Sequence, residues 1–278
     1  METSDCREME KKANERAADG NNSEAFELFV EAGKCWKRWE SFAKTADCFE
    51  RAYEHGMLAQ KYTKAAEILK EAGNSWIKLG EHDKFELDHQ IASEAYILAA
   101  EKEKDPNRLL DGAYSAILGG DLELARQLIH ASAETIRGGA KELINLALML
   151  AEYQFGDADH YIDAAVARVI DKGRFSEVRE IFRLVFIGFV RTTLESELAV
   201  SLSSLAESTG LEMERIKSMV FKALERGLIP AHFDRSSEEL VIDTNRTDLS
   251  DVRRRQRPIL STDLEDPGAW DIDLDEED

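Results

Sequence analysis

The side chains that most often carry catalysis or bind metal ions are present in this sequence, but they do not form a recognisable set. Two of the six histidines, His82 and His89, are seven residues apart, or about two helical turns. No third ligand follows at a metal-binding spacing. The chain also lacks the phosphate-binding glycine loops, the GxSxG nucleophile motif and the HExxH zinc motif. The sequence therefore predicts a protein that is not an enzyme and needs no cofactor or metal.

The three cysteines, Cys6, Cys35 and Cys48, are too few and too irregularly spaced to predict a disulfide framework or a zinc site. Cys35 and Cys48 lie among tryptophan and phenylalanine residues at helical spacing. We therefore expect them to be small buried apolar residues. This cysteine usage is consistent with a reducing compartment.

The residues beyond Asp243 carry the most unusual local chemistry. A basic run, Arg253–Arg257, precedes residues 258–278, which hold nine acidic side chains and no basic one. Such a segment repels itself and buries too little apolar surface to fold alone, so residues 244–278 are predicted to be a disordered tail.

Near the end of this tail, apolar side chains alternate with acids: Trp270, Asp271, Ile272, Asp273, Leu274 and Asp275. An exposed tryptophan in a disordered tail has no folding role. We predict that the apolar side chains enter a groove on another protein while the aspartates steer the approach. The alternative is a tail that only solubilises the chain.

Residues 193–243 contain a second candidate surface. Thr209-Gly210 separates two short helical patterns, and Ser203 is expected to cap the first of them. Gly227 is expected to end the second. Two short apolar runs, Leu228–Phe233 and Leu240–Ile242, then flank a hairpin connection. This order of helix, helix and hairpin predicts a winged helix, a fold that serves both DNA binding and protein assembly.

Charge favours protein assembly over DNA binding. The cations of this module that are expected to contact a partner are Arg215, Lys222, Arg226 and Arg235. Acidic neighbours such as Glu212, Glu214 and Glu225 dilute them, and the whole chain has a formal net charge of -20. Because a DNA-binding surface is usually a basic patch, we expect a protein-contact module without specific nucleic-acid binding. A winged-helix DNA-binding regulator remains as an alternative.

Upstream, residues 23–192 read as one helix after another, with an internal repeat. Glu31–Trp36 (EAGKCW) recurs as Glu71–Trp76 (EAGNSW), 40 residues later. Small residues in a helix let a neighbouring backbone approach closely, and the tryptophan fills the space beside that contact. Since a helix pair of about 34 to 47 residues is the unit of tetratricopeptide-like solenoids, we predict a TPR-like helical solenoid. Trp36 and Trp76 are predicted to be buried between its helices.

The ends and the apolar runs complete the predicted organisation. Residues 1–22 are polar and predicted to be a flexible N-terminus without the features of a signal peptide. The longest strongly apolar run, Leu184–Val190, is far shorter than the roughly 20 residues that span a bilayer. We therefore expect a cytoplasmic protein, mainly α-helical, without membrane insertion.

Helical repeats that run directly into a winged helix resemble the PCI superfamily, the scaffold subunits of the proteasome lid, the signalosome and the translation-initiation assembly. The residues that carry this resemblance are Val200–Ala206, Thr209–Leu211, Ala223–Ile229 and Phe233–Arg235. The resemblance covers about 23–243 in architecture and 198–243 in motif. It implies assembly with other protein subunits through the winged helix, often edge to edge between wings. The predicted function is a non-catalytic scaffold or adaptor subunit of a multiprotein complex.

The Ala-Gly-x-x-Trp helix pairs of residues 23–103 are also similar to the soluble attachment proteins that link SNARE complexes to their disassembly ATPase. In that family an acidic C-terminal end with a leucine engages the ATPase, and the matching residue here is Leu274, between Asp273 and Asp275. The winged-helix stretch departs from that family. The alternative function is therefore a SNAP-like adaptor that recruits a AAA ATPase to a helical-bundle substrate.

Overall fold

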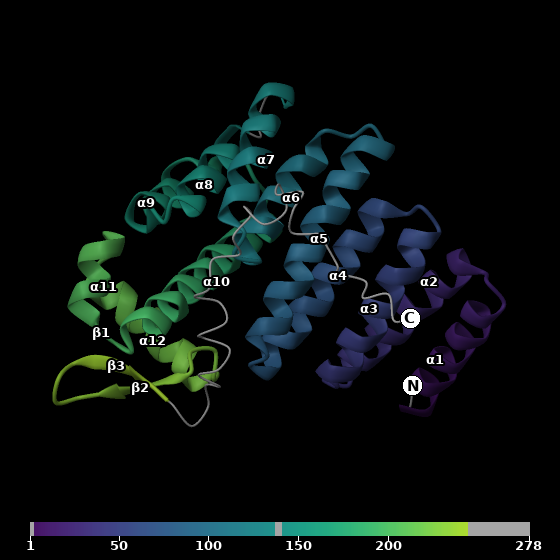
Figure 1. The fold of residues 1–278 in the computed structure, drawn as a ribbon, viewed down its shortest axis with the longest axis horizontal. Coiled ribbons are helices and arrows are strands. Elements are labelled where there is room, and N and C mark those ends of the chain that lie inside the picture. Colours follow the sequence, from purple (N-terminus) through teal and green to yellow (C-terminus); the bar gives the residue numbers. More distant parts are fainter. Residues whose placement is uncertain (1–2, 137–140, 244–278) are drawn as a thin grey trace, which may run out of the picture.

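The structure is a computed structural model that describes residues 3–136 and 141–243. Those residues form twelve α-helices and three short strands (Figure 1). The predicted mainly helical fold class is confirmed. The predicted tail, residues 244–278, lies outside the described residues, and so do its proposed contact residues, which run from Trp270 to Leu274 and Asp275. In the part of the chain that is described, no helix is both long enough and apolar enough to cross a membrane.

The first half of the chain is a row of helices in which each packs mainly against its neighbours in sequence, called here the helical array (Figure 1). The helices and their bounds are α1 (Thr3–Ala18), α2 (Asn22–Arg38), α3 (Phe42–Leu58), α4 (Tyr62–Trp76), the 3-10 turn η1 (Ile77–Leu79), α5 (His82–Lys102), α6 (Asn107–Leu118) and α7 (Leu122–Thr135).

The turns of the array explain its regular step. The helices α2, α3, α4 and α5 begin 20 residues apart, and a residue with positive φ stands two positions before each of them. These turn residues are Gly20, Glu40, Gln60 and Gly80, and Gly120 has the same place before α7. A left-handed residue stops one helix and redirects the chain, so the next helix packs back against it.

Close helix contacts occur where the sequence repeat predicts them. Gly33 of α2 lies so close to the Phe49 ring of α3 that a Cβ would overlap it. Forty residues later, a Cβ on Gly73 of α4 would lie 3.3 Å from the ring of His89 in α5. Trp36 is buried, as predicted, whereas Trp76 is only partly buried.

The N-terminus differs from the prediction of a flexible segment. Residues 3–18 form α1, which packs against α2 through Cys6 and Ala13, both fully buried. The sequence-based expectation was wrong because most charged residues of this segment lie on the exposed side of a helix, whereas Glu10 faces α2 and accepts a hydrogen bond from Trp36. The few small apolar residues, with Met9 and Ala17 among them, lie on the other side at three-to-four spacing.

The prediction of no disulfide was also wrong, because α1 and α2 bring Cys6 and Cys35 together in a disulfide with a Cα–Cα distance of 5.5 Å. Spacing along the chain gave no sign of it, since the two cysteines come from different helices. Disulfides are rare in reducing compartments, so this bond is at odds with the expected cytoplasmic location. Cys48 is a buried free thiol in the same apolar cluster.

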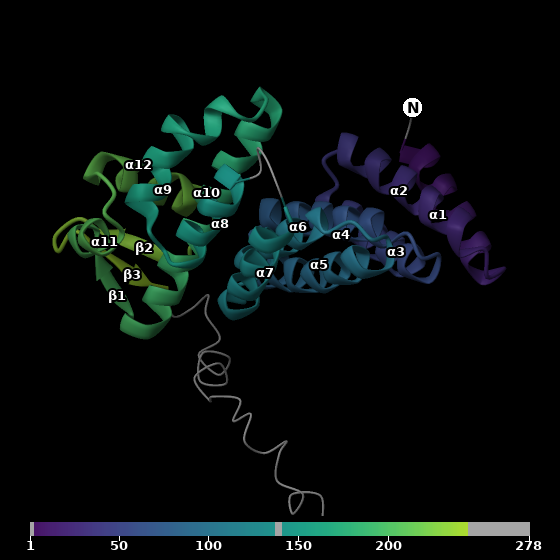
Figure 2. The same ribbon diagram turned by 90° about the horizontal axis from the view of Figure 1, so that it is seen from above.

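The second half surrounds one long helix, α10 (Lys172–Glu197), whose buried face includes Phe182, Phe186 and Val190. One large apolar core runs from the end of the array through α10 to the sheet. The other elements are α8 (Lys141–Ala151), α9 (Phe155–Ala164), the 3-10 turn η2 (Val166–Arg168), α11 (Leu202–Thr209) and α12 (Met213–Glu225). Figure 2 shows α1 and the sheet at opposite ends of the molecule.

The sheet has the order β1-β3-β2, with both pairs antiparallel. Its strands are β1 (Ala199–Ser201), β2 (Ala231–Asp234) and β3 (Glu239–Ile242). The predicted hairpin is present, with its turn at residues 235–238. The sequence did not predict β1, which lies directly before α11, and the cap of α11 is Ser201 rather than Ser203. Ser201 accepts the backbone N–H of Ser204 at 3.0 Å because β1 fixes its extended backbone.

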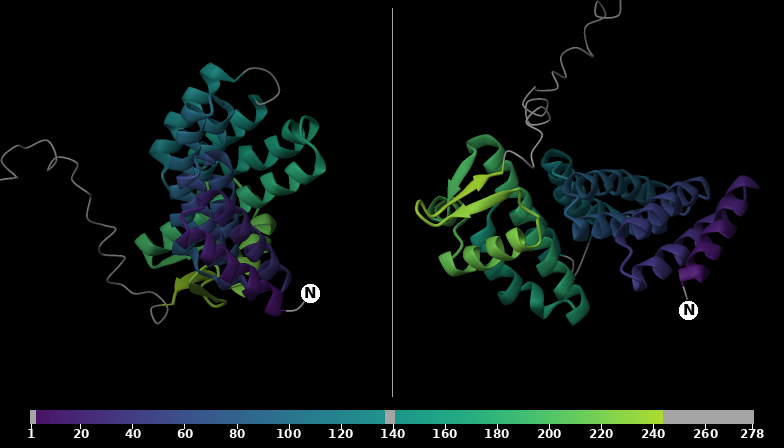
Figure 3. Two further views of the ribbon diagram at one scale, coloured as in Figure 1. Left: turned by 90° about the vertical axis from the view of Figure 1, so that its right-hand side faces the viewer. Right: turned by 90° about the horizontal axis from the view of Figure 1, so that it is seen from below.

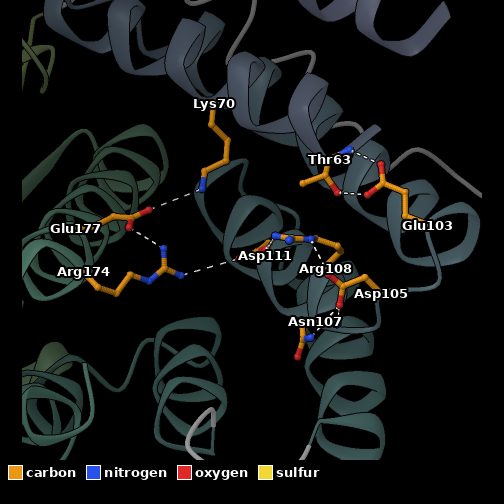
Figure 4. Close-up of polar contacts among 9 residues, drawn as sticks. All are labelled: Thr63, Lys70, Glu103, Asp105, Asn107, Arg108, Asp111, Arg174 and Glu177. Atoms are coloured by element: carbon orange, nitrogen blue, oxygen red, sulfur yellow. Dashed lines mark hydrogen bonds and ion pairs between the residues drawn. The ribbon is translucent and has the colours of Figure 1, made fainter. Parts of the chain in front are cut away.

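Ion pairs connect the array to α10 (Figure 4). Glu177 of α10 lies 3.9 Å from Lys70 of α4 and accepts a hydrogen bond from Arg174 at 2.6 Å. Arg174 in turn lies 3.9 Å from Asp111 of α6, which also pairs with Arg108 at 3.0 Å. Such partly exposed pairs add little stability, but they link α10 to α4 and α6 of the array. The right-hand view of Figure 3 shows the second half of the chain (green) beside the array (blue).

Candidate functional site

The four cations predicted to contact a partner lie on three different surfaces. Arg215 and Lys222, both on α12, line a hollow of about 810 Å³ between α9, α10 and α12. Arg226, at the end of α12, lines a second hollow on the side that faces the helical array. Arg235 is exposed in the turn of the hairpin. The structure therefore does not gather these cations into one patch.

The hollow beside α12 is electrically balanced. Arg215 lies 3.0 Å from Asp159 of α9, which also pairs with Arg179 of α10. Among the described residues that line this hollow, four side chains are cationic and four are acidic, the acids being Asp159, Asp163, Glu180 and Glu212. A phosphate backbone entering it would meet those carboxylates, so its chemistry does not suit nucleic acid.

The second hollow, of about 640 Å³, is called here the array groove because it lies between the helical array, the middle of α10 and the end of α12. Four cations line it against two acids among the described residues: Lys37, Lys78, Arg183 and Arg226 against Glu71 and Glu180. The apolar residues Phe42, Ile77 and Leu228 also line it. This groove was not anticipated, since its walls come from parts of the chain more than 100 residues apart.

The strand β2 is one of the two edge strands of the sheet. Along β3, Ile242 donates its N–H to Leu198 at 3.0 Å, on the β1 side, whereas Asp243 donates to Pro230 at 2.8 Å, on the β2 side. Because antiparallel ladder bonds alternate in direction, the residue opposite Leu240 on β2, which is Phe233, turns its backbone N–H and C=O away from β3. Those groups lie on the outer edge of the sheet.

An aromatic pair lies beside this open edge. Phe221 of α12 and Phe233 of β2 meet edge to face, with ring centroids 5.2 Å apart. Phe221 is 36% exposed and therefore presents part of its ring to the solvent beside β2. Helical spacing alone indicates this exposure, because Phe221 falls outside the buried stripe of α12, which is formed by Ile216, Met219, Val220 and Ala223.

Three buried titratable residues, His82, Asp88 and His89, lie on α5, and Asp88 also lines a hollow of about 400 Å³ with Glu50 and Lys84. Burial raises the pKa of Asp88 to about 8, and the carboxylate of Glu50 adds to that shift. Burial also lowers the pKa of His89 to about 3, with the positive charge of Lys70 as a second cause. His82 and His89, which sequence spacing suggested as a pair, are both buried in packed helix contacts and show no third ligand among the described residues.

One small group of side chains has the composition of a cation site. Glu10, Asp47 and Cys48 place their potential ligand atoms within 4.8 Å of one another. Burial raises the pKa of the Cys48 thiol to about 12, with the charge of Glu10 as a second cause, so it is protonated at neutral pH and is a poor metal ligand in this state. Glu10 already accepts a hydrogen bond from the Trp36 ring at 3.3 Å.

No family model matches the chain, and no curated protein sequence matches it significantly.

Proposed function

We propose that this chain is a non-catalytic scaffold or adaptor subunit of a multiprotein complex, similar to the PCI superfamily, and that it assembles through its C-terminal module. In this proposal the array is a TPR-like helical solenoid and residues 193–243 are a winged helix. Three regularities support the solenoid: the 20-residue step of the helix starts, the left-handed turns, and the repeated glycine contacts of α2 and α4.

The winged-helix assignment is supported by the order of elements at the C-terminus. A short strand, β1, precedes α11 and α12, and the hairpin β2–β3 follows and pairs with β1. The buried side of α12 packs toward α10 and the sheet, so the module forms one unit with the end of the array. A scaffold subunit needs such a rigid attachment, because a flexible one would not fix the geometry of the assembled partners.

The observation that carries the proposed function is the open edge of β2 with Phe221 beside it. Outward-facing strand backbone groups bind an added strand, and a partly exposed aromatic ring next to them supplies the apolar anchor. Together they form a surface suited to a strand from another subunit. This agrees with the edge-to-edge wing contacts that the family resemblance implies.

The structure offers less support for the alternative of a DNA-binding regulator. The α12 cations that would contact phosphate, Arg215 and Lys222, share their hollow with four carboxylates. Arg226 is exposed at the C-cap of α12 and lines the array groove, apart from the hollow that holds Arg215 and Lys222. A duplex laid along α12 would lie over a balanced surface with no excess of positive charge.

Affinity purification of the tagged full-length chain from its native cell tests this proposal, with two point variants. Phe221→Asp places a charge in the proposed contact surface, and Leu198→Asp places the same charge on a 52% exposed apolar residue elsewhere in the module. We expect the unaltered chain and Leu198→Asp to recover partner proteins in near-stoichiometric amount. With Phe221→Asp, the amount of recovered partner should be at least tenfold lower. Equal recovery of the same partners with all three chains would contradict the proposal.

A further inference from the structure

The array groove has a charge opposite to that of the rest of the molecule. We propose that it binds the acidic C-terminal segment 263–278 of the same chain, in cis, with Trp270 as the apolar anchor. This inference does not depend on the proposed function, since an intramolecular contact can form whether or not the chain is a scaffold subunit.

The positive charge of the groove is available for binding. Lys37 pairs with Glu71 and Arg183 pairs with Glu180, so these four charges cancel. Lys78 and Arg226 remain, and neither has a carboxylate within 4.0 Å among the described residues. Arg183 also has a buried Nη1 nitrogen with no hydrogen-bond partner in that part of the chain. The groove therefore keeps an excess of two positive charges on a chain whose net charge is -20.

The floor of the groove suits an aromatic side chain. Ile77 and Leu228 form apolar walls, and Phe42 is partly exposed with the Lys78 ammonium 4.6 Å above its ring centroid. An indole ring entering beside Phe42 would find both an apolar contact and a cation near its face. Trp270 is the one aromatic residue of segment 263–278, so it is the residue that would make both the apolar contact and the cation contact. Its acidic neighbours would then lie near Lys78 and Arg226.

The chain leaves the described structure close to this groove. The Asp243 N–H donates to Pro230 at 2.8 Å, and Leu228, only two residues before Pro230, lines the groove. Trp270 follows Asp243 by 27 residues. A flexible chain of that length has a typical end-to-end distance of about 30 Å, which is enough to reach the groove without extension.

Tethering explains why we assign the groove to this segment rather than to an acidic segment of another protein. A short flexible linker holds its ligand at an effective concentration on the order of millimolar. An acidic segment of another protein would have to displace the tail, so the tail would compete with it for the groove. While the tail is bound, its own aspartates would be unavailable to other proteins.

Zero-length cross-linking of the full-length chain tests this proposal. A carbodiimide joins a lysine amine to a carboxyl group only where the two are in contact. An equal mixture of unlabelled and 15N-labelled chains separates cross-links within one chain from those between chains by mass. We expect cross-links from Lys78 or Lys37 to the acids of residues 271–278. In each cross-linked pair, both peptides should carry the same isotope label.

Three variants make the result specific. Arg226→Glu leaves the Lys78 amine in place but reverses a groove charge, and we expect the yield of the Lys78 cross-link to fall about fivefold, the factor equivalent to about 1 kcal/mol of surface ion pairing. Trp270→Ala, which leaves every groove residue unchanged, should lower it by a similar factor. Arg235→Glu makes the same charge change on the exposed hairpin turn and should leave the yield unchanged.

Two results would overturn the proposal. In the first, the tail cross-links equally to lysines outside the groove, such as Lys84, and the yields do not respond to Arg226→Glu or Trp270→Ala; the tail is then a solvated appendage. In the second, the cross-linked peptides carry mixed labels, and the groove then takes the tail of a second copy.

Discussion

The ring N–H of Trp76 donates to the carboxylate of Glu50 at 2.5 Å, between α4 and α3. Trp36 makes the same contact with Glu10, between α2 and α1, at 3.3 Å, and in both cases the glutamate precedes the tryptophan by 26 residues. A lysine eight residues after each tryptophan completes the arrangement: Lys44 lies 4.1 Å from the Trp36 ring centroid, and Lys84 lies 3.9 Å from that of Trp76. The 40-residue sequence repeat is therefore also a repeat of side-chain contacts.

The two tryptophans should differ in their contribution to stability because their burial differs. Trp36 is 3% exposed, so Trp36→Ala should lower the free energy of unfolding by about 3–5 kcal/mol, the usual range for truncation of a core aromatic residue. Trp76 is partly exposed, and Trp76→Ala should cost less, about 1–3 kcal/mol. Urea denaturation followed by circular dichroism measures both. A larger loss for Trp76→Ala than for Trp36→Ala would contradict this order.

Stability should fall as pH rises across neutrality because of Asp88. The pKa of Asp88 is about 8 in the folded chain, above its ordinary value near 3.8. Between about pH 4 and pH 8 the folded state therefore keeps a proton that the unfolded state has already lost. The contribution of Asp88 to the free energy of unfolding therefore decreases through this range, with a slope of at most about 1.4 kcal/mol per pH unit. Because the lowered pKa of His89 has the opposite effect below its ordinary value of 6.5, we expect the net decrease between about pH 6.5 and pH 8. Denaturation curves at a series of pH values measure it.

Asp88→Asn should remove this contribution and make the variant relatively more stable at pH 8 than at pH 5. Asp157→Asn, an exposed change on α9, should keep the slope of the unaltered chain. An Asp88→Asn variant with the same pH dependence as the unaltered chain would mean that Asp88 is ionised in the folded state.

Two glycines with open space around them should respond in opposite directions to alanine. Gly120 has φ +78° in the turn before α7, and a Cβ there would meet nothing within 4 Å. Gly120→Ala should therefore lower stability by about 1–2 kcal/mol through backbone strain alone. Gly188 lies inside α10, and a Cβ added to it would also meet nothing within 4 Å. Gly188→Ala should raise stability by about 0.5–1 kcal/mol, and thermal melts of both variants give the comparison.

Reduction of the Cys6–Cys35 disulfide should loosen α1 selectively. The bond closes a loop with a sequence separation of 29 residues, and its loss should lower stability by about 2–4 kcal/mol. Amide hydrogen exchange with and without reductant should show faster exchange in α1 while α8–α12 stay protected, because those helices belong to a separate core. A Cys35→Ser variant should reproduce the reduced pattern. Unchanged exchange in α1 after reduction would mean that its packing alone holds it in place.

The sequence predicted the helical class, the burial of Trp36 and the hairpin, because each depends on local periodicity or on turn residues. It did not predict α1, the Cys6–Cys35 disulfide or the array groove. These depend on contacts between distant helices, and no local pattern encodes the charge excess around Lys78 and Arg226. The strand β1 was missed for a similar reason, since its three residues become a strand only by pairing with β3.

The central claim is that the outer edge of β2 binds a strand of another subunit. Amide hydrogen exchange of Phe233, measured in the free chain and in the complex recovered from the native cell, tests it most directly. In the free chain we expect fast exchange at Phe233, whose N–H points away from β3, beside slower exchange at His232. In the complex we predict strong protection of the Phe233 amide. An unchanged exchange rate at Phe233 in a complex that contains the partner in stoichiometric amount would contradict the claim.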